Sequence, residues 1–112
     1  MVAHFLAQRG WDVVVASNGD TALLIARERR PQLVYLDVNL PRLSGYDVCE
    51  QIRSDPHLHD LPVLMTSARS SIDVRAFSLE AGANAYLAKP YELEHLAAVA
   101  ERLVMSRSPS SG

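Results

Sequence analysis

The chain has 112 residues, 48% of them hydrophobic, and a formal net charge of −2, which is typical of one globular domain with a single core. The near-neutral charge gives no basic footprint for nucleic acid or a membrane surface, and no apolar run approaches the ~18 residues that span a bilayer. A single cysteine, Cys49, and a first segment without signal-peptide features predict a soluble protein of the cytoplasm.

Short apolar runs alternate along the chain with amphipathic segments. The second run, "LVYLD", is apolar until its final residue, as expected for a strand that is buried on both faces. The runs that we predict to be strands are 12–16, 33–37, 62–66 and 85–89.

The amphipathic segments repeat their apolar residues at helical spacing and end near proline or glycine. The first residues, "MVAHFLAQRG", resemble the end of a further helix. In the helix that precedes Gly82, we expect Val74, Phe77 and Ala81 to lie on one side. The four segments that we predict to be complete helices are 20–30, 44–55, 72–81 and 92–105.

Strands that alternate with helices through short connections predict a parallel sheet with helices on both faces. In such sheets functional groups gather at the carboxyl ends of the strands, which is where Asp37, Ser67 and Lys89 fall. Taken singly, these residues are typical of a turn, a helix N-cap and a solvated lysine. Together they predict a pocket for an oxyanion.

Three motifs resemble the receiver domain of bacterial two-component response regulators. They are "LDVNLPRLSG", "PVLMTSA" and "LEAGANAYLAKP", and the similarity runs from about Ala3 to Leu103. The resemblance implies a flavodoxin-like, doubly wound parallel sheet in a three-layer α/β/α arrangement. It also implies a signalling protein in a phosphorelay rather than an enzyme.

The resemblance also implies roles for individual residues. Asp37 matches the carboxylate that accepts a phosphoryl group, and Lys89 matches the lysine that pairs with that group. Spacing from Lys89 favours Ser67 over Thr66 as the switch hydroxyl, while Tyr86 matches the switch aromatic, for which a half-buried strand residue is the alternative. The bond before Pro90 is expected to be cis.

The sequence departs from the family at its beginning, because no strand with a pair of metal-binding acids precedes the first helix. Asp37 and the backbone carbonyl of Asn39 are the remaining Mg²⁺ ligands, so we expect an incomplete site. The absent strand is the central one of this fold, so we expect 33–37 to have an unpaired edge and the chain to self-associate through it.

We therefore predict a receiver-like domain over residues 1–105 and a disordered serine-rich tail over 106–112. The expected partner is a sensor histidine kinase or a phosphotransfer protein, with no DNA or membrane contact from this chain alone. Three explanations remain open: a receiver that extends upstream of Met1, a shortened receiver that dimerises, or a pseudo-receiver that binds partners without phosphorylation.

Overall fold

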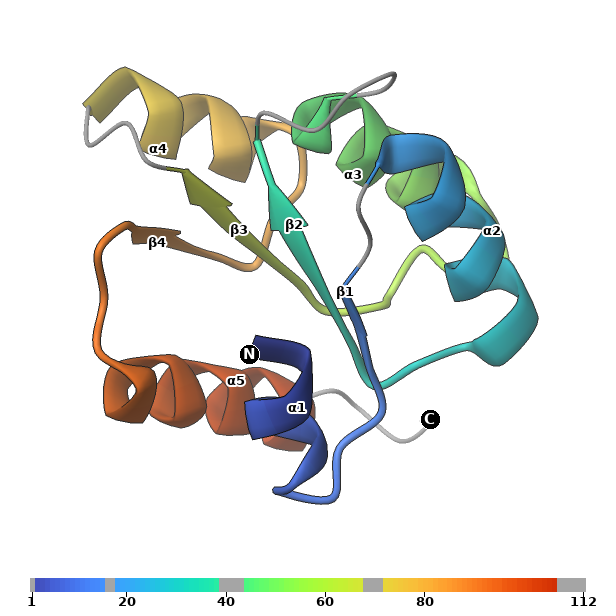
Figure 1. Cartoon of the computed structure of the whole chain (residues 1–112). Helices are drawn as coiled ribbons and strands as arrows, with labels where there is room; N and C mark the ends of the chain where they lie inside the picture. The colour runs from blue at the N-terminus through green and yellow to red at the C-terminus, as the bar shows by residue number, and fades with distance from the viewer. Residues whose placement is uncertain (1, 16–17, 39–43, 68–71, 107–112) are drawn as a thin grey trace.

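A computed structural model describes residues 2–15, 18–38, 44–67 and 72–106 of the chain (Figure 1). All the predicted helices and strands are present, with small shifts at their ends. The elements are α1 (Val2–Ala7), β1 (Val13–Val15), α2 (Gly19–Arg29), β2 (Leu33–Asp37), α3 (Gly45–Ser54), β3 (Val63–Ser67), α4 (Ile72–Glu80), β4 (Ala85–Ala88) and α5 (Leu93–Ser106). Helix α5 includes Ser106, and the rest of the predicted tail, 107–112, lies outside the described residues.

The four strands form one parallel sheet in the order β1-β2-β3-β4. Strand β2 is paired on both sides, with Val34 opposite Val14 of β1 and Val63 of β3. The prediction that residues 33–37 have an unpaired edge is therefore wrong. Buried backbone amides and carbonyls need hydrogen-bond partners, and β1 supplies them by lying directly beside β2.

Helices cover both faces of the sheet, as predicted from the alternating pattern. Helices α2, α3 and α4 lie on one face, and α1 and α5 lie on the other (Figure 1). The first face holds the larger apolar cluster, with Leu36, Ile52 and Met65 fully buried. The second is closed by Leu6 and Leu96. Because helices pack on both faces, the four strands are held in place, and so is the edge of the sheet at which their carboxyl ends lie.

Helix α4 covers the first face less completely than its sequence predicts. Ala81 is buried just after the helix and Val74 packs partly against the core, but the Phe77 side chain is 56% exposed. Its ring meets the edge of Tyr46 with centroids 6.3 Å apart. Phe77 is therefore much more exposed than Val74 and Ala81, with which it was expected to share one side of the helix, because α4 lies at the margin of the sheet and the ring packs on a neighbouring helix.

Within the described ranges, none of the helices combines the length and the apolar character needed to cross a membrane.

Candidate functional site

The three polar residues predicted to converge do lie at one edge of the sheet. Asp37 is the last residue of β2, Ser67 is the last residue of β3, and Lys89 directly follows β4. The parallel register places Asp37 beside Thr66 of β3, and Ser67 beside Ala88 of β4. Adjacent parallel strands end at the same edge, so residues separated by many positions in the sequence become neighbours.

An ion pair joins Asp37 and Lys89. The Lys89 Nζ donates a hydrogen bond to Asp37 Oδ2 at 2.8 Å, and 29% of the Asp37 side chain remains exposed. The Lys89–Pro90 peptide bond is cis, as the resemblance implied. A partly exposed pair of this kind contributes little to stability, but it fixes a positive charge beside an accessible carboxylate.

The two candidate hydroxyl residues have different surroundings. Thr66 is fully buried, and its Oγ1 donates to the carbonyl of Leu87 at 2.7 Å, which ties β3 to β4. Ser67 is also buried, and its side chain is hydrogen-bonded to the hydroxyl of Tyr86. Burial raises the pKa of Tyr86, while the Ser67 hydrogen bond acts in the opposite direction. The structure thus links Ser67, but not Thr66, to the predicted aromatic switch.

Gly45 allows the first turn of α3 to approach the end of β2. Its N–H donates to the Val38 carbonyl at 3.1 Å, and the Ser44 side chain caps the helix by accepting from the Asp47 N–H. A Cβ atom on Gly45 would lie 2.6 Å from the Asp37 carbonyl oxygen and 2.9 Å from Met65 Sδ. The glycine of the "LDVNLPRLSG" motif is therefore needed, because a larger residue would not allow the first turn of α3 to lie this close to the Asp37 backbone.

A contact that the sequence analysis missed lies on the opposite face of the sheet. The hydroxyls of Tyr35, in the middle of β2, and Tyr91, two residues after Lys89, are hydrogen-bonded. Burial and the neighbouring Tyr35 raise the pKa of Tyr91, so the Tyr91 hydroxyl keeps its proton. One signal pointed to this contact: Tyr35 is a polar-tipped aromatic in an otherwise aliphatic buried strand, and such residues usually have a partner for the hydroxyl.

The ligand set at this edge was tested against the requirements of Mg²⁺, which prefers about six oxygens, including one or two carboxylates. Asp37 supplies a carboxylate here, and its Oδ2 accepts from Lys89 Nζ. Within the described ranges, no group of three or more His, Cys, Asp or Glu side chains could hold a metal ion. The predicted second ligand, Asn39, lies outside the described residues. The described residues therefore do not form a magnesium site by themselves.

Comparison with known proteins places this arrangement in a family. A family model, the response regulator receiver domain, matches residues 1–101. Response regulator MprA of Mycobacterium sp. (strain KMS) is 43% identical over 107 residues, which is 96% of this chain and 46% of that protein. The probable transcriptional regulatory protein TcrX of Mycobacterium tuberculosis is 38% identical over 86% of this chain and 40% of its own length. The chain thus spans about half the length of the curated relatives that it matches.

Solved structures give the same result. A putative response regulator from Chloroflexus aurantiacus superposes with a TM-score of 0.86 at 34% identity, covering 94% of this chain and 86% of that one. The receiver domain of the sensor histidine kinase PA1611 from Pseudomonas aeruginosa, described with a magnesium ion coordinated in its active-site cleft, superposes with a TM-score of 0.83 at 28% identity over the same shares. With its parallel sheet and the Asp37–Lys89 pair at the carboxyl edge, the chain belongs to the response regulator receiver domain family.

Proposed function

We propose that this chain is a phospho-accepting receiver domain in which Asp37 is the nucleophile. The observation that carries the proposal is the 2.8 Å contact between Lys89 Nζ and Asp37 Oδ2 at the carboxyl edge of the sheet. Asp37 provides an accessible carboxylate, and Lys89 provides a fixed positive charge at the place where negative charge would accumulate on the phosphoryl oxygens. Receiver domains act as signalling modules and pair with sensor histidine kinases.

The reaction needs little from the protein beyond position and charge. An oxygen of the Asp37 carboxylate forms a bond to phosphorus while the bond from phosphorus to the donor histidine nitrogen breaks. The electron pair of the broken bond stays on the imidazole, and the product is an aspartyl phosphate. In this reaction Lys89 leaves its contact with the carboxylate and pairs with a phosphoryl oxygen. In the family Mg²⁺ supplies charge neutralisation during the transfer.

The switch is the hydrogen bond between Ser67 and Tyr86. After modification, the Ser67 hydroxyl donates to a phosphoryl oxygen and gives up its contact with Tyr86. The ring of Tyr86 then repositions on β4 and changes the surface formed by α4, β4 and α5. A phosphoryl group adds about two negative charges, which is enough to shift the equilibrium between the two arrangements of Ser67 and Tyr86.

The proposed partner is a sensor histidine kinase or a phosphotransfer protein, which presents the phosphohistidine to Asp37 in the cytoplasm. The relatives include proteins named as transcriptional regulators. For this chain alone we expect no DNA contact, because its net charge is −2. Self-association stays a prediction, although pairing of β1 with β2 has removed the open edge on which it rested.

A second candidate is an interaction module that works without phosphorylation. It is favoured by one observation: Lys89 pairs with the Asp37 carboxylate, and the described residues include no group of three or more acidic, histidine or cysteine side chains that could hold a metal ion. In that case the fold presents the α4-β4-α5 surface constitutively, and the chemistry of Asp37 is dispensable.

Beryllofluoride, which mimics a phosphoryl group on a carboxylate, separates the two candidates. Added with Mg²⁺, it should shift the backbone amide resonances of Ser67 and Tyr86, and the Asp37→Asn variant should show no shift. Absence of any shift at millimolar concentrations would overturn the phospho-accepting proposal. Partner binding that is unchanged in Asp37→Asn would then support the second candidate.

A further inference from the structure

Two side-chain contacts join β2 to the connection between β4 and α5. Asp37 accepts from Lys89 Nζ at 2.8 Å, and farther from the edge the hydroxyls of Tyr35 and Tyr91 are hydrogen-bonded. Alternation along β2 places Tyr35 and Asp37 on the same face of the strand. The two contacts therefore lie one behind the other. They link strands that are not neighbours, because β3 lies between β2 and β4 in the sheet.

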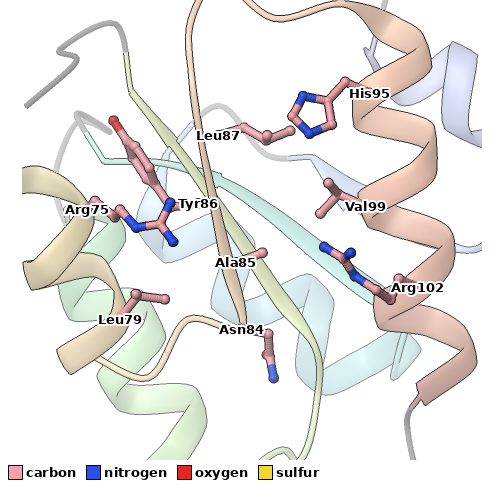
Figure 2. Close-up of a pocket in the computed structure, with 9 residues that line it drawn as sticks. All are labelled: Arg75, Leu79, Asn84, Ala85, Tyr86, Leu87, His95, Val99 and Arg102. Atoms are coloured by element: carbon pink, nitrogen blue, oxygen red, sulfur yellow. The ribbon is translucent and has the colours of Figure 1, made fainter. Parts of the chain in front are cut away.

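The tyrosine pair lies on the face of the sheet that α5 covers, away from the proposed switch. Figure 2 shows the alternation along β4: Tyr86 extends toward α4, and Leu87 extends toward α5. Leu87 and Tyr35 belong to the same apolar cluster, and Tyr91 packs against it. Tyr86 packs against the cluster on the other face. A change in the tyrosine pair therefore leaves the hydrogen bond between Ser67 and Tyr86 untouched.

The tyrosine pair is also the second attachment of the segment that carries Lys89. The backbone N–H of Lys89 donates to the Ser67 carbonyl at 2.9 Å. Pro90 follows and has no N–H to donate. Among the described residues, the next hydrogen bond from this connection to the sheet is that of the Tyr91 hydroxyl. Lys89 is thus held from both sides, by β3 before it and by the tyrosine pair after it.

The pair is suited to hold a position because it is buried and lies near the charged groups. Tyr35 is 7% exposed, and a buried hydroxyl that loses its partner costs more free energy than the hydrogen bond contributes. Burial and the Tyr35 hydroxyl raise the pKa of Tyr91, and the charges of Lys89 and Asp37 also act on it. The contact therefore resists opening, and it lies close to the ion pair of the carboxyl edge.

We propose that the Tyr35–Tyr91 hydrogen bond is a positioning device for Lys89. It keeps the Lys89 ammonium group at the carboxyl edge while the contact with Asp37 is exchanged for one with a phosphoryl oxygen. The ion pair cannot do this itself, because it breaks in the same step. Both tyrosines act through Lys89 rather than on the phosphoryl group. The inference rests on the proposed function for the exchange, but not for the position of Lys89 in the unmodified chain.

Hydrogen exchange in the unmodified chain tests the position without phosphoryl transfer. In Tyr91→Phe the backbone amide of Lys89 should exchange severalfold faster, because the segment that follows it has lost its attachment to β2. The matched control is Ser78→Ala, which removes a buried hydroxyl that donates to the Val74 carbonyl at 2.8 Å within α4. There the Lys89 amide should exchange as in the unsubstituted chain. Unchanged exchange in Tyr91→Phe would overturn the proposal.

Phosphorylation rates test the consequence for the reaction. At a fixed concentration of acetyl phosphate and Mg²⁺, Tyr35→Phe and Tyr91→Phe should each react roughly three- to tenfold more slowly, the factor that corresponds to one hydrogen bond. The double variant keeps both rings and leaves no hydroxyl of the pair without its partner. Its urea midpoint should therefore return toward that of the unsubstituted chain, while its rate stays low. A rate that recovers together with the midpoint would show a merely structural role and overturn the proposal.

Lys89→Gln tests whether the tyrosines act through Lys89. Tyr91→Phe should slow phosphorylation of the unsubstituted chain but leave the residual rate of Lys89→Gln unchanged, because coupled residues are not additive. Equal fold losses in the two backgrounds would overturn the proposal. Absence of phosphorylation in the unsubstituted chain would instead overturn only the proposed function, since exchange of the Lys89 amide still decides whether the tyrosine pair holds this residue in place.

Discussion

The two ends of the sheet are built in different ways. At the amino end of β3 and β4, Arg53 donates to the carbonyls of Leu61 and Gly82 at 2.7 and 2.9 Å and to Asn84 Oδ1 at 2.7 Å. The same Asn84 oxygen also accepts from the Val63 N–H at 2.8 Å. At the carboxyl end, Lys89 Nζ donates to Asp37 Oδ2 at 2.8 Å, and both of these side chains are partly exposed.

This difference separates stability from function. A guanidinium with several main-chain acceptors can be removed only by leaving buried carbonyls without donors, which is costly. A solvent-exposed ion pair contributes about 0–1 kcal/mol, so Asp37 and Lys89 can exchange partners at low cost. The amino end therefore holds the strands in place, whereas the phosphorylation that we propose at the carboxyl end would require only the exchange of a partly exposed ion pair.

The largest effect is expected at the amino end. Arg53→Ala should lower the free energy of unfolding by about 3 kcal/mol, because at least two carbonyls and one amide lose a charged donor. Urea denaturation measures this change. The control is Arg27→Ala, which removes an exposed pair with Asp55 and should cost less than about 1 kcal/mol. Equal losses in the two variants would contradict the account of the amino end.

Gly45→Ala should act on the carboxyl end. The added methyl group would contact the Asp37 carbonyl and Met65, so we expect a loss of roughly 2 kcal/mol, as for other overpacked sites. Because the contact displaces the Asp37 backbone, phosphorylation should slow as well. Gly10→Ala provides the comparison, since nothing lies within 4 Å of its added Cβ although its φ is +85°. That variant should lose some stability but phosphorylate normally.

Alkaline pH should lower the free energy of unfolding through Cys49, which lies in the core between the two ends of the sheet. Burial raises the pKa of the Cys49 thiol to about 11, with the Arg53 charge acting in the opposite direction. The native state therefore retains a proton that the unfolded state releases, and the free energy of unfolding should fall as pH rises from about 9 to about 11. Cys49→Ala should remove this part of the decrease, on the order of 2 kcal/mol. An identical alkaline decrease in the variant would assign it to other groups.

Lys89→Gln should produce the smallest change in stability and a large change in chemistry. Loss of the exposed ion pair should alter the free energy of unfolding by less than about 1 kcal/mol, while phosphorylation of Asp37 should slow strongly. Denaturation and the rate of phosphoryl incorporation measure the two effects. A stability loss as large as that of Arg53→Ala would show that Lys89 is a structural residue.

The sequence predicted the helices and strands well because their apolar periodicity and their proline and glycine boundaries are local signals. "LVYLD" gave the bounds of β2, and Asp37, Ser67 and Lys89 were found because residues at strand ends share an edge. The direct pairing of β1 with β2 was not predicted, since the choice of neighbour depends on which backbone groups remain to be satisfied in the whole sheet.

Long-range side-chain contacts were also beyond the sequence. Arg53 falls within the predicted helix 44–55 and Asn84 lies between the predicted segments 72–81 and 85–89, and no sequence pattern relates them, although the two are hydrogen-bonded in the fold. The Tyr35–Tyr91 pair likewise joins residues 56 positions apart. The tertiary fold decides which distant residues become partners, and local propensity and periodicity do not contain this information.

The most direct test of the central claim is the intact mass of the chain after incubation with acetyl phosphate and Mg²⁺. The proposal predicts a mass increase of one phosphoryl group in the unsubstituted chain, no increase in Asp37→Asn, and little increase in Lys89→Gln. An unmodified mass in the unsubstituted chain, or an equal increase in Asp37→Asn, would contradict the assignment of Asp37 as the phospho-acceptor.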